Sequence, residues 1–197
     1  LEFPRLTSIS NRSARYVSVF LTPDGNGAVL LLEDAQRSIR LRTLEAQYYR
    51  AIMAHEWGRN HLNGHLGSFW SGASCRDISF KLPHTRVVAH AATLAEQLIN
   101  LHDNRGAVIR IWTRDPTSSV VDMAEVPAFG ESVHTVGRLT VFIDKGLEAK
   151  LREMRQAGLP SETGGVLLGY YDFNLGEAVI VDALPPPLDS ECSTTGF

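Results

Sequence analysis

The sequence predicts a mixed α/β fold of the α+β type, in which a region of hairpins and helices precedes a strand-helix-strand-strand unit. Apolar residues recur at helical spacing in residues 42–53 and 88–101. Short β-branched runs bounded by turn residues lie before, between and after these two segments. The chain has 197 residues, of which 44% are hydrophobic and 21% charged, as in ordinary globular proteins. A chain of this length and composition can bury a core.

The first elements are predicted to be a β-hairpin and an amphipathic helix. Residues 16–21 alternate in polarity, residues 28–32 form an apolar run, and Asp24-Gly25-Asn26-Gly27 between them is a tight-turn signal. The helix covers residues 42–53, where the apolar side chains fall on one face: Leu44, Tyr48, Ala51 and Ile52.

The charged residues of this helix and of the segment before it are predicted to form a solvated face. They are Arg37, Arg40, Arg42, Glu45 and Arg50. Because four of the five are arginines, a patch for an acidic partner is the alternative interpretation.

The middle of the chain is predicted to contain a loop, a buried helix and a second hairpin. Residues 57–79 hold glycines, tryptophans, histidines and a cysteine with neither periodicity, which indicates an irregular loop with functional potential. Strand-like runs at 107–112 and 120–126 flank a turn at 115–118. The helix over 88–101 is expected to be buried along the stripe of Ala91, Leu94, Ala95, Leu98 and Leu101.

A domain boundary is predicted at residues 127–137, which are rich in glycine and polar residues and contain a lone proline. It separates a first region, 1–126, from a second unit, 138–197. In the second unit, the patterns predict a strand at 139–143, a helix at 146–155 and strands at 164–171 and 178–183. Three consecutive prolines at 185–187 end the last strand, because proline cannot donate a backbone hydrogen bond.

The bulk composition excludes several classes of function. The net charge of −3 and the pI near 6.2 lack the basic footprint of a nucleic-acid-binding protein. There is no apolar run long enough to span a membrane and no secretion-type N-terminus, so a cytoplasmic location is expected. The two cysteines, Cys75 and Cys192, lie far apart in unlike surroundings, which argues against a disulfide scaffold.

Glu162 is the first candidate catalytic residue. It stands at the start of Glu162-Thr163-Gly164-Gly165-Val166-Leu167-Leu168-Gly169, where a carboxylate precedes two glycines and a buried-type strand. Desolvation there would raise the pKa of the carboxyl group and favour proton transfer, while the glycines allow close approach of a backbone or ligand. The alternative is a solvated carboxylate at a strand start, with the glycines serving a turn.

Over residues 138–197, this motif and the elements around it resemble the JAMM/MPN (JAB) family of zinc-dependent isopeptidases, which remove ubiquitin-like modifiers. The resemblance also includes the end of the last strand, Leu-Pro-Pro-Pro-Leu-Asp-Ser. In that family, the matching glutamate handles the proton of a zinc-bound water. The resemblance therefore implies a general acid/base role for Glu162.

The family's zinc is held by a His-x-His pair and an Asp that follow the glutamate strand. The present chain has no histidine after Glu162, so no metal ligand is assigned. The expectation is that the chain carries only the N-terminal part of such a domain, that zinc belongs to the parent protein, and that the chain alone is inactive. A non-catalytic module that binds a ubiquitin-like protein or a partner subunit, as metal-free family members do, is the alternative.

Residues 16–126 resemble the C-terminal part of ThiF-type adenylating enzymes, which activate ubiquitin-like proteins. The shared pattern is a hairpin with a glycine-rich turn, a cysteine-bearing loop, a long apolar helix and a closing hairpin. The resemblance implies a ubiquitin-like protein as partner, with a conjugating-enzyme-like protein as a second one. ATP would be bound upstream of Leu1; no cofactor-binding residue is assigned within the chain because it lacks a phosphate-binding glycine motif.

Cys75 is the second candidate catalytic residue. Small residues precede it, and Arg76 beside it favours the thiolate. Its position before the long helix resembles that of the thioester-forming cysteine of activating enzymes. A buried, inert thiol and the nucleophile of a small cysteine-dependent transferase are the two alternatives.

Two further expectations concern histidines and assembly. His61 and His65 have the i, i+4 spacing of metal ligands, but Asn63 and Gly64 disfavour a helix there, so both are interpreted as polar loop residues. An incomplete sheet in the second unit would leave an unpaired edge, which is expected to recruit a second copy of the chain.

Overall fold

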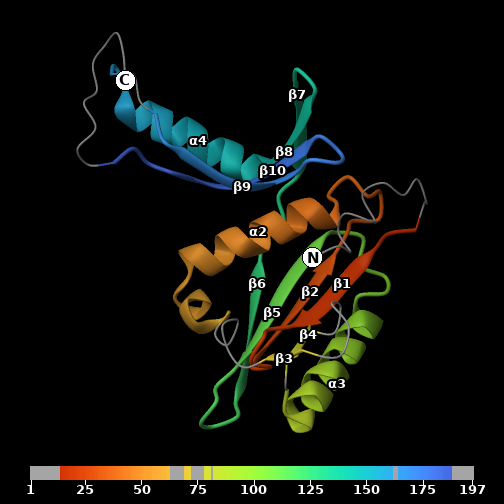
Figure 1. The fold of residues 1–197 in the computed structure, drawn as a ribbon. Helices are drawn as coiled ribbons and strands as arrows, with labels where there is room; N and C mark the ends of the chain where they lie inside the picture. Colours follow the sequence, from red (N-terminus) through yellow and green to blue (C-terminus); the bar gives the residue numbers. More distant parts are fainter. Residues whose placement is uncertain (1–13, 63–68, 72–77, 81, 162–163, 188–197) are drawn as a thin grey trace.

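The computed structural model describes residues 14–62, 69–71, 78–80, 82–161 and 164–187. Within them the chain has a mixed α/β fold, with two four-stranded sheets and a helix between the sheets (Figure 1). The predicted fold class is confirmed. No helix in these ranges is both long and apolar enough to cross a membrane.

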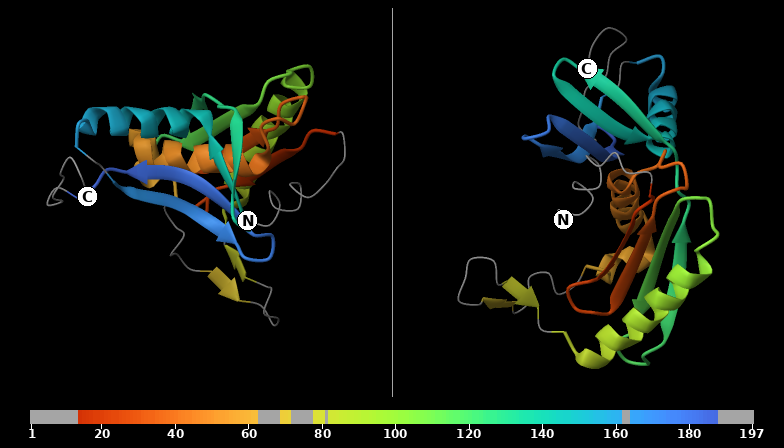
Figure 2. Two further views of the ribbon diagram at one scale, coloured as in Figure 1. Left: turned by 90° about the horizontal axis from the view of Figure 1, so that it is seen from above. Right: turned by 90° about the vertical axis from the view of Figure 1, so that its right-hand side faces the viewer.

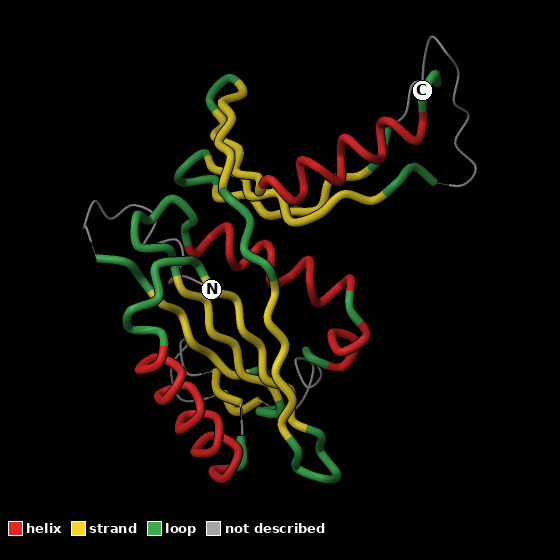
Figure 3. Tube along the Cα trace, turned by 180° about the vertical axis from the view of Figure 1, so that it is seen from behind, coloured by secondary structure: helices red, strands yellow, loops and turns green. Residues whose placement is uncertain are grey.

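The first sheet has the strand order β1-β2-β5-β6, and every neighbouring pair is antiparallel. Its strands are β1 (Val17–Leu21), β2 (Gly27–Leu32), β5 (Val108–Arg114) and β6 (Val121–Val126), which run side by side in Figure 3. Both predicted hairpins are therefore confirmed. In the first, the Thr22 N–H donates to the Gly27 carbonyl at 2.9 Å, and Gly25 takes the left-handed backbone conformation that favours glycine, with φ of 70°.

Helix α3 (His84–Asn100) covers one face of the first sheet, where Leu94 and Leu101 are buried. The helix begins four residues before the predicted start at residue 88. The predicted buried stripe is partly wrong, because Ala91 and Ala95 are exposed. The helix contacts the sheet through Leu94 and the partly buried Leu98, and His90 is buried as well.

The predicted irregular loop at 57–79 contains regular elements. A 3-10 helix, η1 (Glu56–Asn60), follows α2, and β3 (Phe69–Ser71) pairs antiparallel with β4 (Ile78–Phe80). The prediction of an irregular segment is therefore wrong for these residues. Three-residue strands are too short to display a period of two in the sequence.

Helix α2 (Leu41–Ala54) lies between the two sheets, as Figures 1 and 2 both show. Leu41, Leu44 and Tyr48 pack against β2 and β5 of the first sheet. Ala46, on another face of the helix, packs against the second sheet. As a result, residues 41–48 are all buried.

The predicted solvated face of this helix is wrong for Arg42 and Glu45, which are 9% and 5% exposed. The Arg42 guanidinium stacks on the ring of Phe142 at 3.4 Å and pairs with Glu177 at 3.1 Å. Arg50 donates to both carboxylate oxygens of Asp144, at 2.6 and 2.8 Å. These charged side chains attach the helix to the second sheet instead of facing water.

The second sheet has the order β7-β8-β10-β9, with β8 and β10 parallel and the other pairs antiparallel. Its strands are β7 (Glu131–Val136), β8 (Leu139–Asp144), β9 (Val166–Asp172) and β10 (Glu177–Leu184). Helix α4 (Lys145–Gly158) covers the face opposite α2, through Leu147, Leu151 and Met154. The predicted strand-helix-strand-strand order is confirmed as β8-α4-β9-β10.

The predicted linker at 127–137 contains β7, so its second half is a strand and not a connection. Gly130 and Gly137 at the two ends of this strand gave the segment its turn-like composition. The division of the chain into two domains stays a prediction. Strands β7 and β9 form the two edges of the second sheet, and the expected recruitment of a second copy likewise stays a prediction.

Candidate functional site

The glycine motif that follows Glu162 borders a cavity of about 250 Å³ at the start of β9. Helix α4 contributes Leu151, Met154 and Arg155 to its wall, and the motif contributes Gly164 and Gly165. Glu162 and Thr163 lie outside the described residues. The residues that follow Glu162 in the sequence therefore line an apolar cavity with one cationic side chain.

Two glycines of the motif are required by close approach of the neighbouring strand. A Cβ atom at Gly165 would lie 2.4 Å from the Leu184 carbonyl oxygen, and one at Gly169 would lie 2.3 Å from the Val179 carbonyl oxygen. Both obstacles are backbone atoms of β10, which cannot rotate away. This motif thus fits tight packing of β9 on β10, as expected for glycines inside a strand.

The described residues do not fit a zinc site. Among them, no three His, Cys, Asp or Glu side chains come together closely enough to hold a metal ion. After Glu162 the sequence also supplies no histidine. No step of a reaction is therefore assigned to a metal held by this chain.

Cys75, the second predicted catalytic residue, also lies outside the described residues, as do Cys192 and His65. In the sequence, Cys75 falls between β3 and β4, and the two strands pair with each other. A role as a thioester-forming nucleophile stays a prediction.

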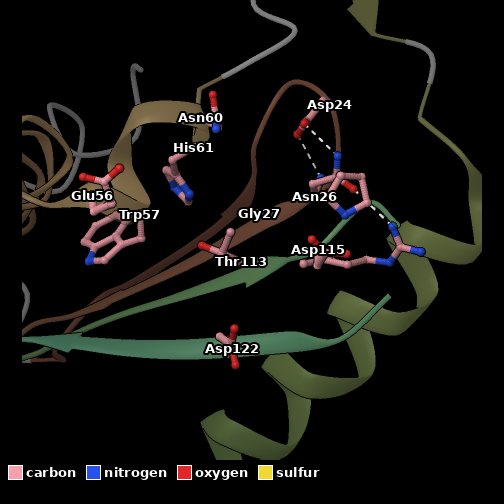
Figure 4. Close-up of a pocket in the computed structure, with 12 residues that line it drawn as sticks. Asp24, Asn26, Gly27, Glu56, Trp57, Asn60, His61, Thr113, Asp115 and Asp122 are labelled. Carbon is pink, nitrogen blue, oxygen red and sulfur yellow. Dashed lines mark hydrogen bonds between the residues drawn. The ribbon is translucent and has the colours of Figure 1, made fainter. Parts of the chain in front are cut away.

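A second cleft, which sequence patterns did not predict, lies where the β1–β2 turn, η1 and the β5–β6 turn meet (Figure 4). Its volume is about 430 Å³. Four carboxylates and a single guanidinium, that of Arg114, are its charged groups; the carboxylates belong to Asp24, Glu56, Asp115 and Asp122. A cleft with this excess of negative charge attracts cationic groups.

His61 lies in the turn after η1, as its interpretation as a loop residue predicted, but it is buried in the wall of this acidic cleft and only 3% exposed. Its Nε2 lies 3.0 Å from the hydroxyl of Tyr48, whose own pKa is raised by burial. Nδ1 of the same ring has no hydrogen-bond partner among the described residues. Burial lowers the pKa of His61 to about 4, so the imidazole is neutral at physiological pH.

We expect His61→Gln to change how folding stability depends on pH. The folded pKa of about 4 lies below the ordinary value of 6.5, so between these values the unfolded chain binds a proton that the folded imidazole does not. The stability that the wild-type protein gains from keeping His61 neutral is fully present above pH 6.5. It is lost as the pH falls toward 4, by up to about 1.4 kcal/mol per pH unit.

Urea unfolding of wild-type and variant protein at several pH values between 4 and 7.5 measures this difference. Burial raises the pKa of Glu45 to about 7, which adds an opposing pH dependence to the stability of both proteins. The difference between wild-type and variant stability removes this shared contribution. Replacing the exposed His102 with Gln is the matched control. Parallel pH profiles for the wild-type protein and His61→Gln would contradict the expected coupling.

Comparison of the chain with protein-family models, with curated proteins and with solved structures gave no match. The resemblances to the JAMM/MPN and ThiF-type families therefore stay predictions that rest on motif residues. The acidic cleft had no sequence signal that could have located it. Its residues come from the β1–β2 turn, the 3-10 helix η1 and the β5–β6 turn, which only the fold brings together.

Proposed function

We propose that this chain is part of an enzyme that activates or removes a ubiquitin-like modifier, and that its second unit belongs to a JAMM-type isopeptidase domain. One observation carries the proposal: the motif from Glu162 to Gly169 follows α4 in the sequence and its second half, from Val166, forms the start of β9 in a β8-α4-β9-β10 unit. The close approach of β10 to Gly165 and Gly169 gives a physical reason for the motif's glycines.

In this proposal, Glu162 is the general acid/base. Its carboxylate accepts a proton from the water that attacks the isopeptide carbonyl, and donates it to the leaving amine as the carbon–nitrogen bond breaks. Cys75 is proposed as the thioester-forming residue of the activating half. Zinc ligands and the ATP site would have to come from residues that this chain does not contain.

We expect Glu162→Gln to lower kcat for isopeptide cleavage by at least about a hundredfold, the lower end of what general acid/base groups contribute. The measurement uses the full-length gene product with added zinc, and the probe is ubiquitin joined by an isopeptide bond to the lysine of a fluorescent peptide. Glu153→Gln is the matched control, because Glu153 is exposed on α4 and makes the same change of charge. Equal turnover by the wild-type protein and Glu162→Gln would rule out the proposed role.

A second candidate function is favoured by an apolar groove on the α4 side of the second sheet. The groove has a volume of about 610 Å³, and aliphatic side chains form most of its wall: Val136, Leu139, Val141, Ile143, Leu167 and Ile180. Such a surface suits a module that binds a ubiquitin-like protein without cleaving it. Stoichiometric binding of the modifier with no turnover in the same assay would favour this function over the first.

A further inference from the structure

A cavity of about 270 Å³ lies between the first half of α3 and the β5–β6 turn, and all its titratable groups are basic. Arg86 and His90 enter it from α3, and Arg114 enters it from the end of β5. Thr85, Thr93 and Ser119 add hydroxyl groups to its wall. None of the described residues that line it carries a carboxylate.

The guanidinium groups of Arg86 and Arg114 have N–H donors that the hydrogen bonds in the structure do not use. Arg86 donates through Nη1 to the Asp24 carbonyl at 2.7 Å. Arg114 donates through Nη1 to the side chain of Asn26, at 3.3 Å, and through Nη2 to Ser119. A guanidinium has five N–H donors, so both groups can still bind an anion. Their existing bonds hold them in place beside the β1–β2 turn.

His90 lies in the wall of the cavity and is 2% exposed. The imidazole hydrogen-bonds to the Gly25 carbonyl, and its Nε2 has no partner within the described part of the chain. The bond to Gly25 therefore comes from Nδ1. Burial and, to a lesser extent, the charge of Arg114 lower the pKa of His90. An anion beside Nε2 would act in the opposite direction: it would stabilise the imidazolium, whose Nε2–H could then donate to the anion.

The start of α3 adds positive potential on the same side. This 17-residue helix has no side-chain cap at Pro83 and no acidic residue in its first turn. The partial positive charge of its N-terminus is therefore not screened by a carboxylate of the helix. Thr85 in that first turn lines the cavity.

The carboxylates of Asp24 and Asp115, in the two turns beside the cavity, accept hydrogen bonds within their own turns. Asp24 accepts hydrogen bonds from Thr22 and Asn26 within its own turn. Asp115 accepts from the backbone N–H groups of Thr117 and Ser118. Both carboxylates line the acidic cleft and not this cavity, and Arg114 is shared by the two. The negative charge of the two carboxylates still acts on His90 and Arg114, but among the described residues neither carboxylate takes up the remaining N–H donors of Arg86 and Arg114.

We propose that this cavity binds the phosphate group of a small ligand, with Arg86, Arg114 and His90 as its ligating side chains. Two guanidinium groups, an imidazole nitrogen and hydroxyl groups reach the cavity from two separate elements. This arrangement suits a tetrahedral oxyanion with several acceptor oxygens better than a planar carboxylate with two.

Titration of the protein with inorganic phosphate, followed by NMR at constant ionic strength, tests this proposal. We expect saturable shifts of the His90 imidazole signals and a rise in its pKa, because a bound anion stabilises the imidazolium. Acetate at the same ionic strength is expected to bind at least about tenfold more weakly, since it offers fewer acceptors. No saturable response to phosphate, or equal affinity for acetate, would overturn the proposal.

Variants locate the site. Arg86→Gln and Arg114→Gln are each expected to weaken phosphate binding about tenfold, the loss of one charge-assisted hydrogen bond. Arg152→Gln, which removes the same charge from an exposed position on α4, is expected to leave the affinity unchanged. If all three variants weakened phosphate binding equally, phosphate would be responding to the net charge of the protein and not to a specific site. That result would contradict the proposal.

A second substitution keeps the test valid if the arginine variants fail to fold. Thr85→Glu introduces a carboxylate at the edge of the cavity, in a first turn of a helix where acidic residues are stabilising. We expect it to abolish phosphate binding while the protein stays folded. Thr85→Gln, of the same size but neutral, is expected to retain binding. Unchanged affinity in Thr85→Glu would place any bound phosphate elsewhere.

Discussion

Replacing Asp144 with alanine is expected to lower the free energy of unfolding by about 3 kcal/mol, because it leaves the largely buried Arg50 guanidinium with the Val181 carbonyl but without its carboxylate partner. Asp144 is 1% exposed, and its two oxygens accept hydrogen bonds from Arg50 at 2.6 and 2.8 Å. Oδ1 also accepts from the Leu147 N–H and so caps the start of α4. The substitution removes both functions. Urea unfolding followed by circular dichroism measures the loss.

The exposed pair of Arg110 and Glu125 provides the matched control. Their atoms are also 2.6 Å apart, but the Glu125 side chain is 53% exposed. Glu125→Ala is therefore expected to cost less than about 1 kcal/mol. In the double variant Arg50→Met, Asp144→Ala, part of the stability should return, because both buried charges are then removed. A loss below 1 kcal/mol for Asp144→Ala alone would show that the α2 contact does not depend on this pair.

Replacing Gly169 with alanine is expected to destabilise the protein by about 3 kcal/mol, at the upper end for overpacking. The added Cβ would lie 2.3 Å from the Val179 carbonyl oxygen and 3.2 Å from the Ile180 Cα. Gly169 pairs with Ile180 where the register of β9 on β10 shifts, so the clash falls on a fixed backbone irregularity. Relief requires β9 to move away from β10. Thermal unfolding and amide hydrogen exchange in β9 measure the effect.

Gly106→Ala is the control for this substitution. A Cβ at Gly106 would meet only the Asn104 Oδ1, at 3.5 Å, which is an ordinary contact. Its effect on stability is expected to stay within about 0.5 kcal/mol. If Gly169→Ala were equally mild, the close packing of β9 on β10 would not be the reason for a glycine at this position.

Local patterns predicted most helices and strands of the fold. The turn from Asp24 to Gly27 and the apolar run after it determine the first hairpin, because turn geometry and alternation act between neighbouring residues. The same holds for α4, which the helical spacing of residues 146–155 predicted. Strand β7 was missed because its flanking glycines resemble a linker more strongly than its six residues resemble a strand.

The burial of α2 could not be predicted in this way. Its charged residues have the spacing of a solvated face, and that prediction would hold for a helix covering one sheet. The partners that bury Arg42 and Arg50 lie far along the chain: Glu131, Asp144 and Glu177. Charge pairing at such separations leaves no periodic signal in either segment.

Some candidate sites could be predicted from neighbouring residues in the sequence, and others could be found only in the tertiary structure. Glu162 and Cys75 were identified from the residues beside them in the sequence, and their roles stay predictions. The acidic cleft with His61 and the basic cavity with His90 join side chains from the β1–β2 turn, the helices and the β5–β6 turn. A single histidine in a sequence does not reveal whether it will be buried, because burial depends on which distant segments pack against it.

The sequence by itself determined the α+β class, the hairpins, the helices and the glycine motif, because hydrogen-bonding geometry and side-chain periodicity act over a few neighbouring residues. The tertiary structure decided which face of each element is buried, which charges are paired and where the cavities lie. These features arise from desolvation and packing between segments far apart in the chain, which local patterns do not encode.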